Sequence, residues 1–517
     1  MMSSKISTIK TIVIAFFVIS QIAVLVQSAP IEQSEDLDPL IDLEITFELQ
    51  KIRSLEKHNK YLHSREYIDI FSDPDFYIKL WINDELFTSP IFRNTRYIYE
   101  PNWSVTTDVA DDEEWVDITI QLWDWNIGID RKCDISGFHR DGKDSTEVNL
   151  RYSLKYNQWI GDDYLEKLYI NADPSGYGRL NGCDDGTIYS HDYDCELWFN
   201  IYQNDFDNDG LSYFTETELY NTDPTLDDRG RDDDNDSVPI EWEHKWGQSI
   251  VWDYNTFEYK YVQWYDPFTW EDHRTLDPDY DGLTNYEEYL TSLWGSDPFR
   301  KDLFVELDKM DEGPQGQITV FPQESMEMLH TVFHRQNIVL YIDDGWMGGG
   351  EIIPFDDTSS IDEIRDIYWN YFLHQDEENW RFGVFHYAVL LYNAEGAAGF
   401  GFSGRIKPVI DSFQISSLGL ETKSKLPLLN RDIVFASAFM HELGHTLGIF
   451  RGNTPGCDDQ NGKYPWQKNW WKWRPYTSVM NYGYMYKMVD YSDGSRGKND
   501  FDDWGRIDFT YFETPLW

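Results

Sequence analysis

The stretch NRDIVFASAFMHELGHTL, residues Asn430–Leu447, determines the fold expected for the C-terminal part of this 517-residue chain. Asn430 is a residue type that caps helices, and Asp432 suits the positive end of a helix dipole. The residues from Ile433 to Leu447 are almost wholly apolar, which predicts a helix buried on most sides. We therefore expect this helix to lie in the core of a domain.

Three ionisable side chains interrupt the apolar helix: His441, Glu442 and His445. Residues four positions apart lie on the same helix face, so both imidazoles can bind one zinc ion. Glu442 lies one position further round and can reach a water molecule on that metal, whose pKa zinc lowers to about 7. A carboxylate in this place can take a proton from the water and deliver it to a leaving amine. The pattern predicts zinc-dependent hydrolysis of peptide bonds.

The segment SVMNYG, residues Ser478–Gly483, follows the helix further along the chain. Together with the histidine pair and Gly448, it resembles the methionine turn and zinc-binding helix of the metzincin proteases. The resemblance implies an α+β zincin-type catalytic domain over residues 299–517, in which Tyr482 supports the oxyanion. Hydrophobic periodicity predicts strands at 303–307, 338–342 and 382–391 and a helix at 324–335.

The chain differs from the metzincins at the position of the third zinc ligand. The metzincin pattern places a histidine where this chain has Arg451, and a guanidinium cannot bind a metal ion. No histidine follows His445, so the third ligand must be a carboxylate or a cysteine, or be absent. The loop after the helix offers Cys457, Asp458 and Asp459. We expect Asp458 to complete the site, with Cys457 as the alternative.

Clustered aspartates characterise residues 204–298. Two stretches match the calcium-loop pattern, with carboxylates at positions 1, 3, 5 and 12 and glycine at position 6. A stretch between them keeps the four carboxylates but has Ser237 in place of the glycine, so we expect weaker calcium binding there. The predicted calcium ligands are Asp205, Asp207, Asp209 and Glu216 in the first loop, Asp232, Asp234, Asp236 and Glu243 in the second, and Asp277, Asp279, Asp281 and Glu288 in the third.

The two complete loops continue into Asp-Pro pairs, at Asp223-Pro224 and Asp297-Pro298. In this respect the segment resembles thrombospondin type-3 and related EF-hand-like calcium repeats. The resemblance implies a structural role for calcium. The alternative is an acidic linker without an ion.

Residues 29–203 contain five short stretches of alternating polarity separated by turn residues, at 43–49, 77–82, 116–123, 148–154 and 197–202. Such a pattern predicts an antiparallel β-sandwich. Two segments, 72–79 and 122–137, resemble the conserved-region-2 sandwich of protein kinase C, although Asn126 stands where that family usually has an aspartate. The resemblance implies calcium ligands at Asp73, Asp124 and Asp134 and contact with a membrane surface. A plain sandwich with acidic turns and no ion is the alternative.

The first 28 residues have the layout of a secretory signal peptide. Lys5 and Lys10 precede an apolar run that ends at Val26, and the small residue Ser28 marks the expected cleavage point. We therefore expect a secreted, extracellular protein. Anchoring at the cell surface by an uncleaved segment is the alternative.

The chain is strongly acidic, with 43 Lys and Arg against 93 Asp and Glu and a net charge of −50. A surface of this sign repels phosphate backbones, which excludes nucleic acid as a partner. Aromatic residues make up 17% of the chain, too many for a disordered acidic tail.

These features predict a multidomain secreted zinc metalloendopeptidase with zinc and calcium as cofactors and a protein or peptide as substrate. The signal peptide (1–28) is followed by the sandwich (29–203), the calcium-loop repeats (204–298) and the catalytic domain (299–517). The competing hypothesis is a calcium-dependent surface-binding or adhesive protein whose protease-like domain is inactive.

Overall fold

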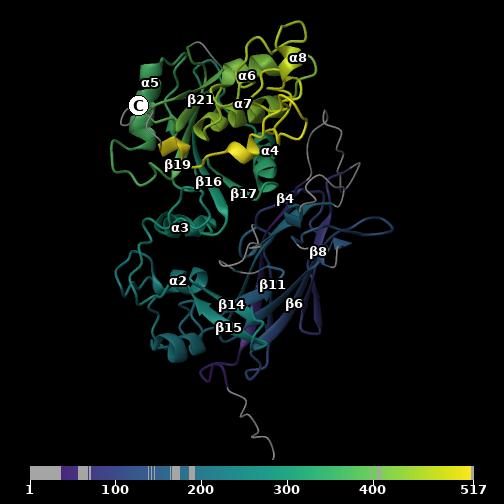
Figure 1. Cartoon of the computed structure of the whole chain (residues 1–517), viewed down its shortest axis with the longest axis vertical. Coiled ribbons are helices and arrows are strands. Elements are labelled where there is room, and N and C mark those ends of the chain that lie inside the picture. The colour runs from purple at the N-terminus through teal and green to yellow at the C-terminus, as the bar shows by residue number, and fades with distance from the viewer. Residues whose placement is uncertain are drawn as a thin grey trace, which may run out of the picture.

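The computed structural model describes residues 36–55, 68, 72–137, 139–140, 143–144, 146–163, 165, 175–185, 193–395, 398–404 and 409–513 (Figure 1). The predicted signal peptide lies outside these ranges. Within them, no helix has both the length and the apolar character needed to cross a bilayer. The C-terminal domain lies at one end of the long axis, and the sandwich and the repeat segment lie at the other end (Figure 1).

The N-terminal part is a sandwich of two antiparallel sheets, which confirms the predicted architecture. The first sheet has the order β12 (Arg179–Asn181), β13 (Cys195–Gln203), β1 (Glu44–Ser54), β4 (Tyr97–Ile98), with β5 (Trp103–Asp108) also paired with β1. The second has the order β11 (Gln158–Gly161), β10 (Val148–Ser153), β6 (Trp115–Asp124), β2 (Phe76–Ile82), β3 (Glu85–Thr88), with β7 (Arg131–Lys132) paired with β6. A separate hairpin joins β8 (His139–Arg140) to β9 (Lys143–Asp144), and η1 (Gly182–Asp185) precedes β13.

Alternation along the strands builds the sandwich core. In β6, Ile118 and Ile120 are buried while their neighbours face outward. Both pack in one cluster with Phe47 of β1, so side chains from the two sheets meet between them.

The repeat segment connects the sandwich to the C-terminal domain. It consists of η2 (Thr215–Tyr220), α2 (Ile240–Trp246), the hairpin β14 (Gln248–Asp253) and β15 (Glu258–Gln263), α3 (Asn285–Thr291) and η3 (Ser292–Trp294). The hairpin lies against the sandwich, where the rings of Tyr259 and Trp115 are 5.1 Å apart. Sequence analysis did not predict this hairpin.

The C-terminal domain is built on a mostly parallel sheet. The strand order is β17 (Ile338–Asp343), β16 (Lys301–Met310), β19 (Phe385–Leu391), β21 (Ser412–Ser416), β20 (Gly399–Phe402), with β18 (Ile352–Ile353) also paired with β16. Only β20 runs antiparallel to its neighbour. The predicted strands at 303–307, 338–342 and 382–391 correspond to β16, β17 and β19.

Helices cover both faces of this sheet. On one face, α4 (Gln323–His334), α6 (Ser417–Ser424) and α7 (Arg431–Thr446) form a cluster that includes Val305 of β16 and Phe439 of α7. On the other face, α5 (Ile361–Ile367) and η4 (Tyr368–Phe372) pack with Phe304 and Tyr387. Val305 and Phe304 point to opposite faces because side chains alternate along a strand. The remaining helices are α8 (Trp470–Trp473), η5 (Trp504–Arg506) and η6 (Tyr511–Glu513).

The helix predicted from Asn430 is α7. The Asn430 side chain accepts hydrogen bonds from the backbone N–H groups of Asp432, at 2.8 Å, and Ile433, at 3.2 Å, so it caps the helix as expected. The helical prediction for 324–335 corresponds to α4.

A buried ion pair joins the sandwich to the C-terminal domain. Arg53 of β1 lies 2.9 Å from Glu327 of α4, and their side chains are 1% and 5% exposed. Removing one partner of such a pair leaves an uncompensated buried charge, so loss of either side chain should weaken this interface.

Candidate functional site

Helix α7 presents two imidazoles in a defined orientation. The Nδ1 atom of His441 lies 2.9 Å from the Val479 carbonyl oxygen, and that of His445 lies 2.8 Å from the Ile449 carbonyl oxygen. A carbonyl accepts but cannot donate, so each Nδ1 carries the proton. In the neutral form of each ring, Nε2 then has a lone pair, which is the tautomer that metal-binding histidines adopt.

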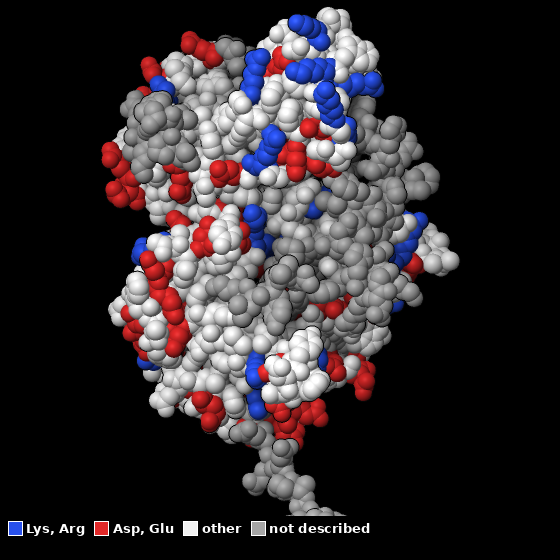
Figure 2. All heavy atoms as spheres, in the orientation of Figure 1, with Lys and Arg blue, Asp and Glu red and all other residues white. Residues whose placement is uncertain are grey.

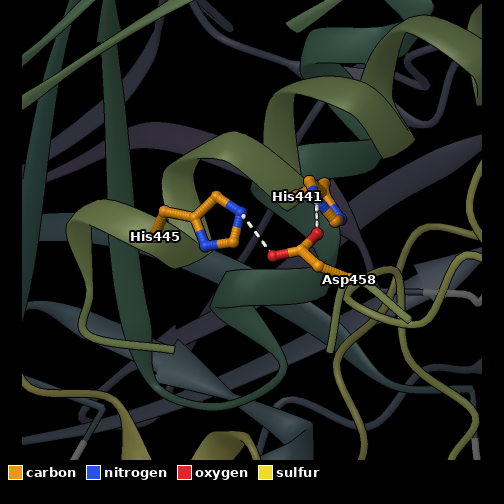
Figure 3. A group of neighbouring side chains, drawn as sticks. All are labelled: His441, His445 and Asp458. Carbon is orange, nitrogen blue, oxygen red and sulfur yellow. Dashed lines mark ion pairs between the residues drawn. The ribbon is translucent and has the colours of Figure 1, made fainter. Parts of the chain in front are cut away.

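Asp458 completes a group of three potential metal ligands (Figure 3). Its Oδ1 lies 3.1 Å from Nε2 of His441, and its Oδ2 lies 3.5 Å from Nε2 of His445. One ligand atom from each of the three residues lies within 4.8 Å of the others. Asp458 has a left-handed backbone with φ of 52°, and its N–H donates to the Met480 carbonyl oxygen at 3.2 Å. The structure thus brings together the three residues predicted to bind zinc.

The charge state of Asp458 suits this role. Burial acts to raise the pKa of its carboxyl group, but the hydrogen bond and charge of His441 outweigh burial and hold that pKa below its usual value. The carboxylate is therefore ionised at neutral pH, as a metal ligand must be.

Met480 packs against helix α7 at Gly444, which lies between the two histidines in the sequence. It is fully buried, and a Cβ atom built on Gly444 would meet its Sδ atom at 2.7 Å. A side chain at this point of the helix would therefore have to displace the end of the Met480 side chain. The same backbone segment supplies the Val479 carbonyl that orients His441. The turn around Met480 therefore supports the site.

Glu442 is buried beside the histidines and is 4% exposed. Burial is the main cause that raises its pKa to about 7. A carboxyl group with such a pKa can both accept and donate a proton near neutral pH. The edge strand β20 lies next to it, because a Cβ atom on Gly399 would meet Oε1 of Glu442 at 2.6 Å. Sequence analysis missed Gly399, since no local pattern connects it to a helix about 40 residues away.

Tyr482 lies against the same group. Its ring stacks on His441, with centroids 5.5 Å apart and an interplanar angle of 21°. Burial, and after it the negative charge of Asp458 and a hydrogen bond to its carboxylate, raise the pKa of the phenol well above its usual value. The hydroxyl stays protonated and is a hydrogen-bond donor at the site.

The other candidates for the third ligand have different surroundings. Burial raises the pKa of the Cys457 thiol, which disfavours the thiolate needed for metal binding. Asp459 accepts hydrogen bonds from Asn469 and from the Trp473 indole, both at 2.7 Å, so it organises the loop. Arg451 is exposed. These contacts favour Asp458 over its neighbours.

The three predicted calcium loops share one backbone turn. The residue at position six has a left-handed conformation in each, with φ of 98° at Gly210, 92° at Ser237 and 95° at Gly282. Its N–H donates to the first aspartate of its own loop at 3.2, 3.1 and 3.2 Å. In every loop the three aspartates bring carboxylate oxygens within 4.8 Å of one another. The middle loop therefore keeps the glycine-like turn, although a serine is strained in it.

The glutamate at position twelve lies on the helical turn that follows each loop. Glu216 is in η2, Glu243 in α2 and Glu288 in α3, and all three are buried. Burial and neighbouring carboxylates raise their pKa values, to about 8 for Glu216 and about 10 for Glu243. Carboxyl groups crowded in this way need protons or a cation to offset their repulsion.

The third loop is joined to the C-terminal sheet. The backbone N–H of Asp302, in β16, donates to Oδ2 of Asp281 at 2.6 Å. One of the proposed ion ligands of this loop, Asp281, is therefore hydrogen bonded directly to strand β16.

The three aspartates assigned by resemblance in the sandwich have partners within the protein. Asp73 pairs with Arg96 at 3.1 Å. Asp124 accepts a hydrogen bond from the Asn126 side chain at 2.6 Å, and Asp134 accepts one from a backbone N–H two residues further on at 2.9 Å. Such contacts are those of acidic turns, the alternative to a calcium site.

No family model and no curated protein matches the sequence. Among solved structures, the sandwich region is similar to C2 domains. One C2 domain is 9% identical with a TM-score of 0.17 and covers 31% of this chain and 98% of its own. The calcium-bound pair of C2 domains of extended-synaptotagmin 2 is 11% identical with a TM-score of 0.18 and covers 32% of this chain and 47% of its own. A C2 domain protein from Ramazzottius varieornatus is 13% identical with a TM-score of 0.18 and covers 31% of this chain and 87% of its own. TM-scores this low do not establish a shared fold, so the description of the sandwich rests on its strand pairing.

Proposed function

We propose that this protein is a secreted zinc-dependent metalloendopeptidase. The observation that carries the proposal is the convergence of His441, His445 and Asp458 beside the buried carboxyl group of Glu442. Two imidazoles and one carboxylate are a ligand set typical of catalytic zinc and leave one coordination position open. Zinc analysis of the purified protein, combined with an assay on unfolded casein, tests the proposal.

Each residue has a distinct task in this mechanism. Bound zinc supplies Lewis acidity, which lowers the pKa of a water molecule and polarises the scissile carbonyl. Glu442, which is buried beside the histidines, would take the proton of the attacking water and deliver it to the leaving amine. The Tyr482 hydroxyl would donate a hydrogen bond to the carbonyl oxygen of the scissile bond, which becomes negative in the transition state.

The edge strand β20 is the proposed peptide-binding element. It is the last strand in the sheet order and lies next to both Glu442 and the helix that carries the histidines. An extended substrate can add to such an edge through backbone hydrogen bonds, which places its scissile bond near the glutamate.

Replacing Gly399 with alanine should lower activity on casein by at least about tenfold while zinc content and melting temperature change little. The new methyl group would meet Oε1 of Glu442 at 2.6 Å and displace the flexible carboxyl group rather than backbone. Moving a catalytic group by about 1 Å costs up to roughly 100-fold in rate. Steady-state kinetics and zinc analysis measure both effects.

Gly401→Ala is the matched control on the same strand. A Cβ atom there meets its nearest neighbour at 3.4 Å, close to ordinary contact. Equal activity of the two variants would contradict the placement of β20 against Glu442.

We further propose that calcium binds the first and third repeat loops and stabilises the link to the catalytic sheet. Alternate aspartates and a glutamate on the following helix supply the oxygen ligands that calcium requires. The bond between Asp281 and the start of β16 supports a structural role for the third loop.

In a chelator, the melting temperature of the intact chain should fall as the pH rises from about 5 to about 8. Burial, together with neighbouring aspartates, raises the pKa of Glu216 to about 8 and that of Asp209 to about 7. The folded chain holds these protons more tightly than the unfolded chain, whose carboxyl pKa values are about 4. The stabilisation from these bound protons is therefore complete below about pH 4. It is lost as the pH rises through the pKa values that the two groups have in the folded chain. Differential scanning fluorimetry at constant ionic strength measures the change.

Calcium should remove this pH dependence, because the bound ion favours ionised carboxylates. Asp209→Asn should reduce the difference between calcium and chelator, whereas Asp227→Asn, at an exposed position outside the loops, should not. Identical melting temperatures in calcium and chelator at pH 8 would show that the segment is an acidic linker.

The second candidate function is calcium-dependent surface binding. Ile127 and Ile129, in one loop of the sandwich, are 97% and 85% exposed, which favours contact with a membrane or another apolar surface. Flotation with anionic vesicles tests this contact. A protein that binds vesicles but contains no zinc and does not cleave casein would support the surface-binding hypothesis over the peptidase.

A further inference from the structure

The middle loop of the repeat segment differs from the other two because a histidine from outside the loop lies among its carboxylates. Glu271 and His273 lie beside Asp236 and Glu243, and the four offer ligand atoms within 4.8 Å of one another. Nε2 of His273 lies 3.2 Å from Oδ2 of Asp236 and 3.6 Å from Oε1 of Glu243. In the first and third loops, the corresponding groups consist of aspartates.

His273 is fully buried and held in one orientation. The side-chain amide of Asn285 lies 2.9 Å from its Nδ1 atom. The rings of Trp242 and Tyr265 contact the imidazole edge-on, with centroids 5.8 and 4.9 Å away. Nδ1 accepts the hydrogen bond from the Asn285 amide NH2, so Nε2 of the neutral ring carries a proton toward the carboxylates. A metal ion at Nε2 requires the Asn285 amide to be turned over so that its oxygen accepts from Nδ1–H. Here the arrangement directs Nε2 toward the carboxylates.

Glu243 provides an independent indication of a ligand. It is 1% exposed, and its Oε1 atom has no hydrogen-bond partner in the described part of the chain. A buried carboxylate in this position requires a cation or a proton.

The serine at position six has a contact that explains its presence. Its hydroxyl lies 3.1 Å from a guanidinium nitrogen of Arg274, which donates to it. The backbone N–H of Glu271 also reaches Oδ2 of Asp236, at 3.4 Å. Ser237 and Asp236 therefore hold the segment that carries Glu271 and His273 against the loop. A glycine would keep the turn but lose the first of these contacts.

We propose that the middle loop is a transition-metal site for an ion such as zinc, formed by Asp236, Glu243, Glu271 and His273, and not a third calcium site. Imidazole is a ligand that zinc and its neighbours bind well, whereas calcium selects oxygen atoms. Three carboxylates and one imidazole match the ligand types of a first-row divalent metal. This site is separate from α7 and does not depend on the proposed peptidase activity.

The test uses the full chain with His273→Gln. Glutamine can place an oxygen near the position of Nε2, so it replaces the nitrogen ligand by one that suits calcium. After chelation, reloading with zinc and calcium together and desalting, metal analysis should find one equivalent of zinc fewer and one equivalent of calcium more than in the unsubstituted protein. His374→Gln, an exposed histidine, is the matched control and should leave both contents unchanged. Equal zinc content with and without His273→Gln would overturn the proposal.

A second variant protein distinguishes zinc bound at the α7 site from zinc bound at the middle loop. The His441→Ala/His445→Ala protein should retain one equivalent of zinc, which His273→Gln then removes. If that background retained no zinc while the unsubstituted protein held one equivalent, the middle site would be rejected and the α7 site supported. If the double alanine substitution left the zinc content unchanged, the α7 proposal would fail and this one would stand.

A second experiment leaves the middle loop unsubstituted, so it tests the site even if the His273→Gln protein does not fold. Cobalt added to the His441→Ala/His445→Ala protein should produce a visible absorption band that micromolar zinc abolishes and millimolar calcium does not. Loss of the band on addition of calcium would assign the loop to calcium. If the double alanine protein does not fold, the same titration of the intact protein should show a cobalt component, beyond one equivalent, that resists calcium. Its absence would reject the site.

Discussion

Replacing Glu442 with glutamine is expected to lower the kcat for casein hydrolysis by about 100- to 10,000-fold while zinc stays bound. The amide has nearly the same shape as the carboxyl group but cannot accept a proton from the attacking water. Glu442 is buried beside the histidines, within reach of a water molecule on the proposed zinc ion. Zinc content is unaffected because the proposed ligands are on other residues.

The measurement combines steady-state kinetics with metal analysis of the same preparation. Glu378→Gln, an exposed glutamate of the same domain, is the control and should keep full activity. Activity of Glu442→Gln within about a factor of two of the unsubstituted enzyme would reject the proposed mechanism. Loss of zinc in this variant would instead make Glu442 a ligand.

Asp458→Ala should reduce zinc affinity and activity together. Its two oxygens lie 3.1 and 3.5 Å from the Nε2 atoms of His441 and His445, so the substitution removes one of three proposed ligands. Removing a residue that only hydrogen bonds to a metal ligand lowers metal affinity by roughly 10- to 100-fold. Removing a ligand itself should lower the affinity further. Competition with a chromogenic chelator measures the zinc affinity.

The neighbouring residues supply the controls for this prediction. Asp459→Asn keeps an acceptor for Asn469 and Trp473 and should retain zinc, whereas alanine at this position would disturb the loop. A Cys457→Ser variant that lost zinc while Asp458→Ala kept it would reassign the third ligand to the cysteine. Arg451→His should not rescue Asp458→Ala, because position 451 lies in an exposed turn.

The arrangement of α7 illustrates how much of the site could be predicted from local sequence. A spacing of four residues places His441 and His445 on one face whatever the rest of the chain does, because helix geometry is local. The calcium loops are local in the same sense, since ligands at fixed positions in twelve residues share one turn. The antiparallel sandwich also followed from short-range alternation. The resemblance of the proposed catalytic domain to the metzincins rests on two short motifs, the histidine pair and the turn around Met480.

The tertiary structure decided the contacts between segments that are far apart in the sequence. The loop residues Cys457, Asp458 and Asp459 are chemically plausible ligands in the sequence, and only the path of the chain turns Asp458 toward the histidines and Asp459 toward Trp473. The approach of Gly399 to Glu442 and that of His273 to Asp236 depend on how strands and loops pack. No spacing rule predicts them, because each requires a turn or hairpin whose direction is set by the surrounding core. The mixture of charges on the surface in Figure 2 likewise depends on which side chains the fold leaves outside. The sequence by itself therefore determined which chemical groups each helix and loop presents, whereas packing determined which of these groups meet.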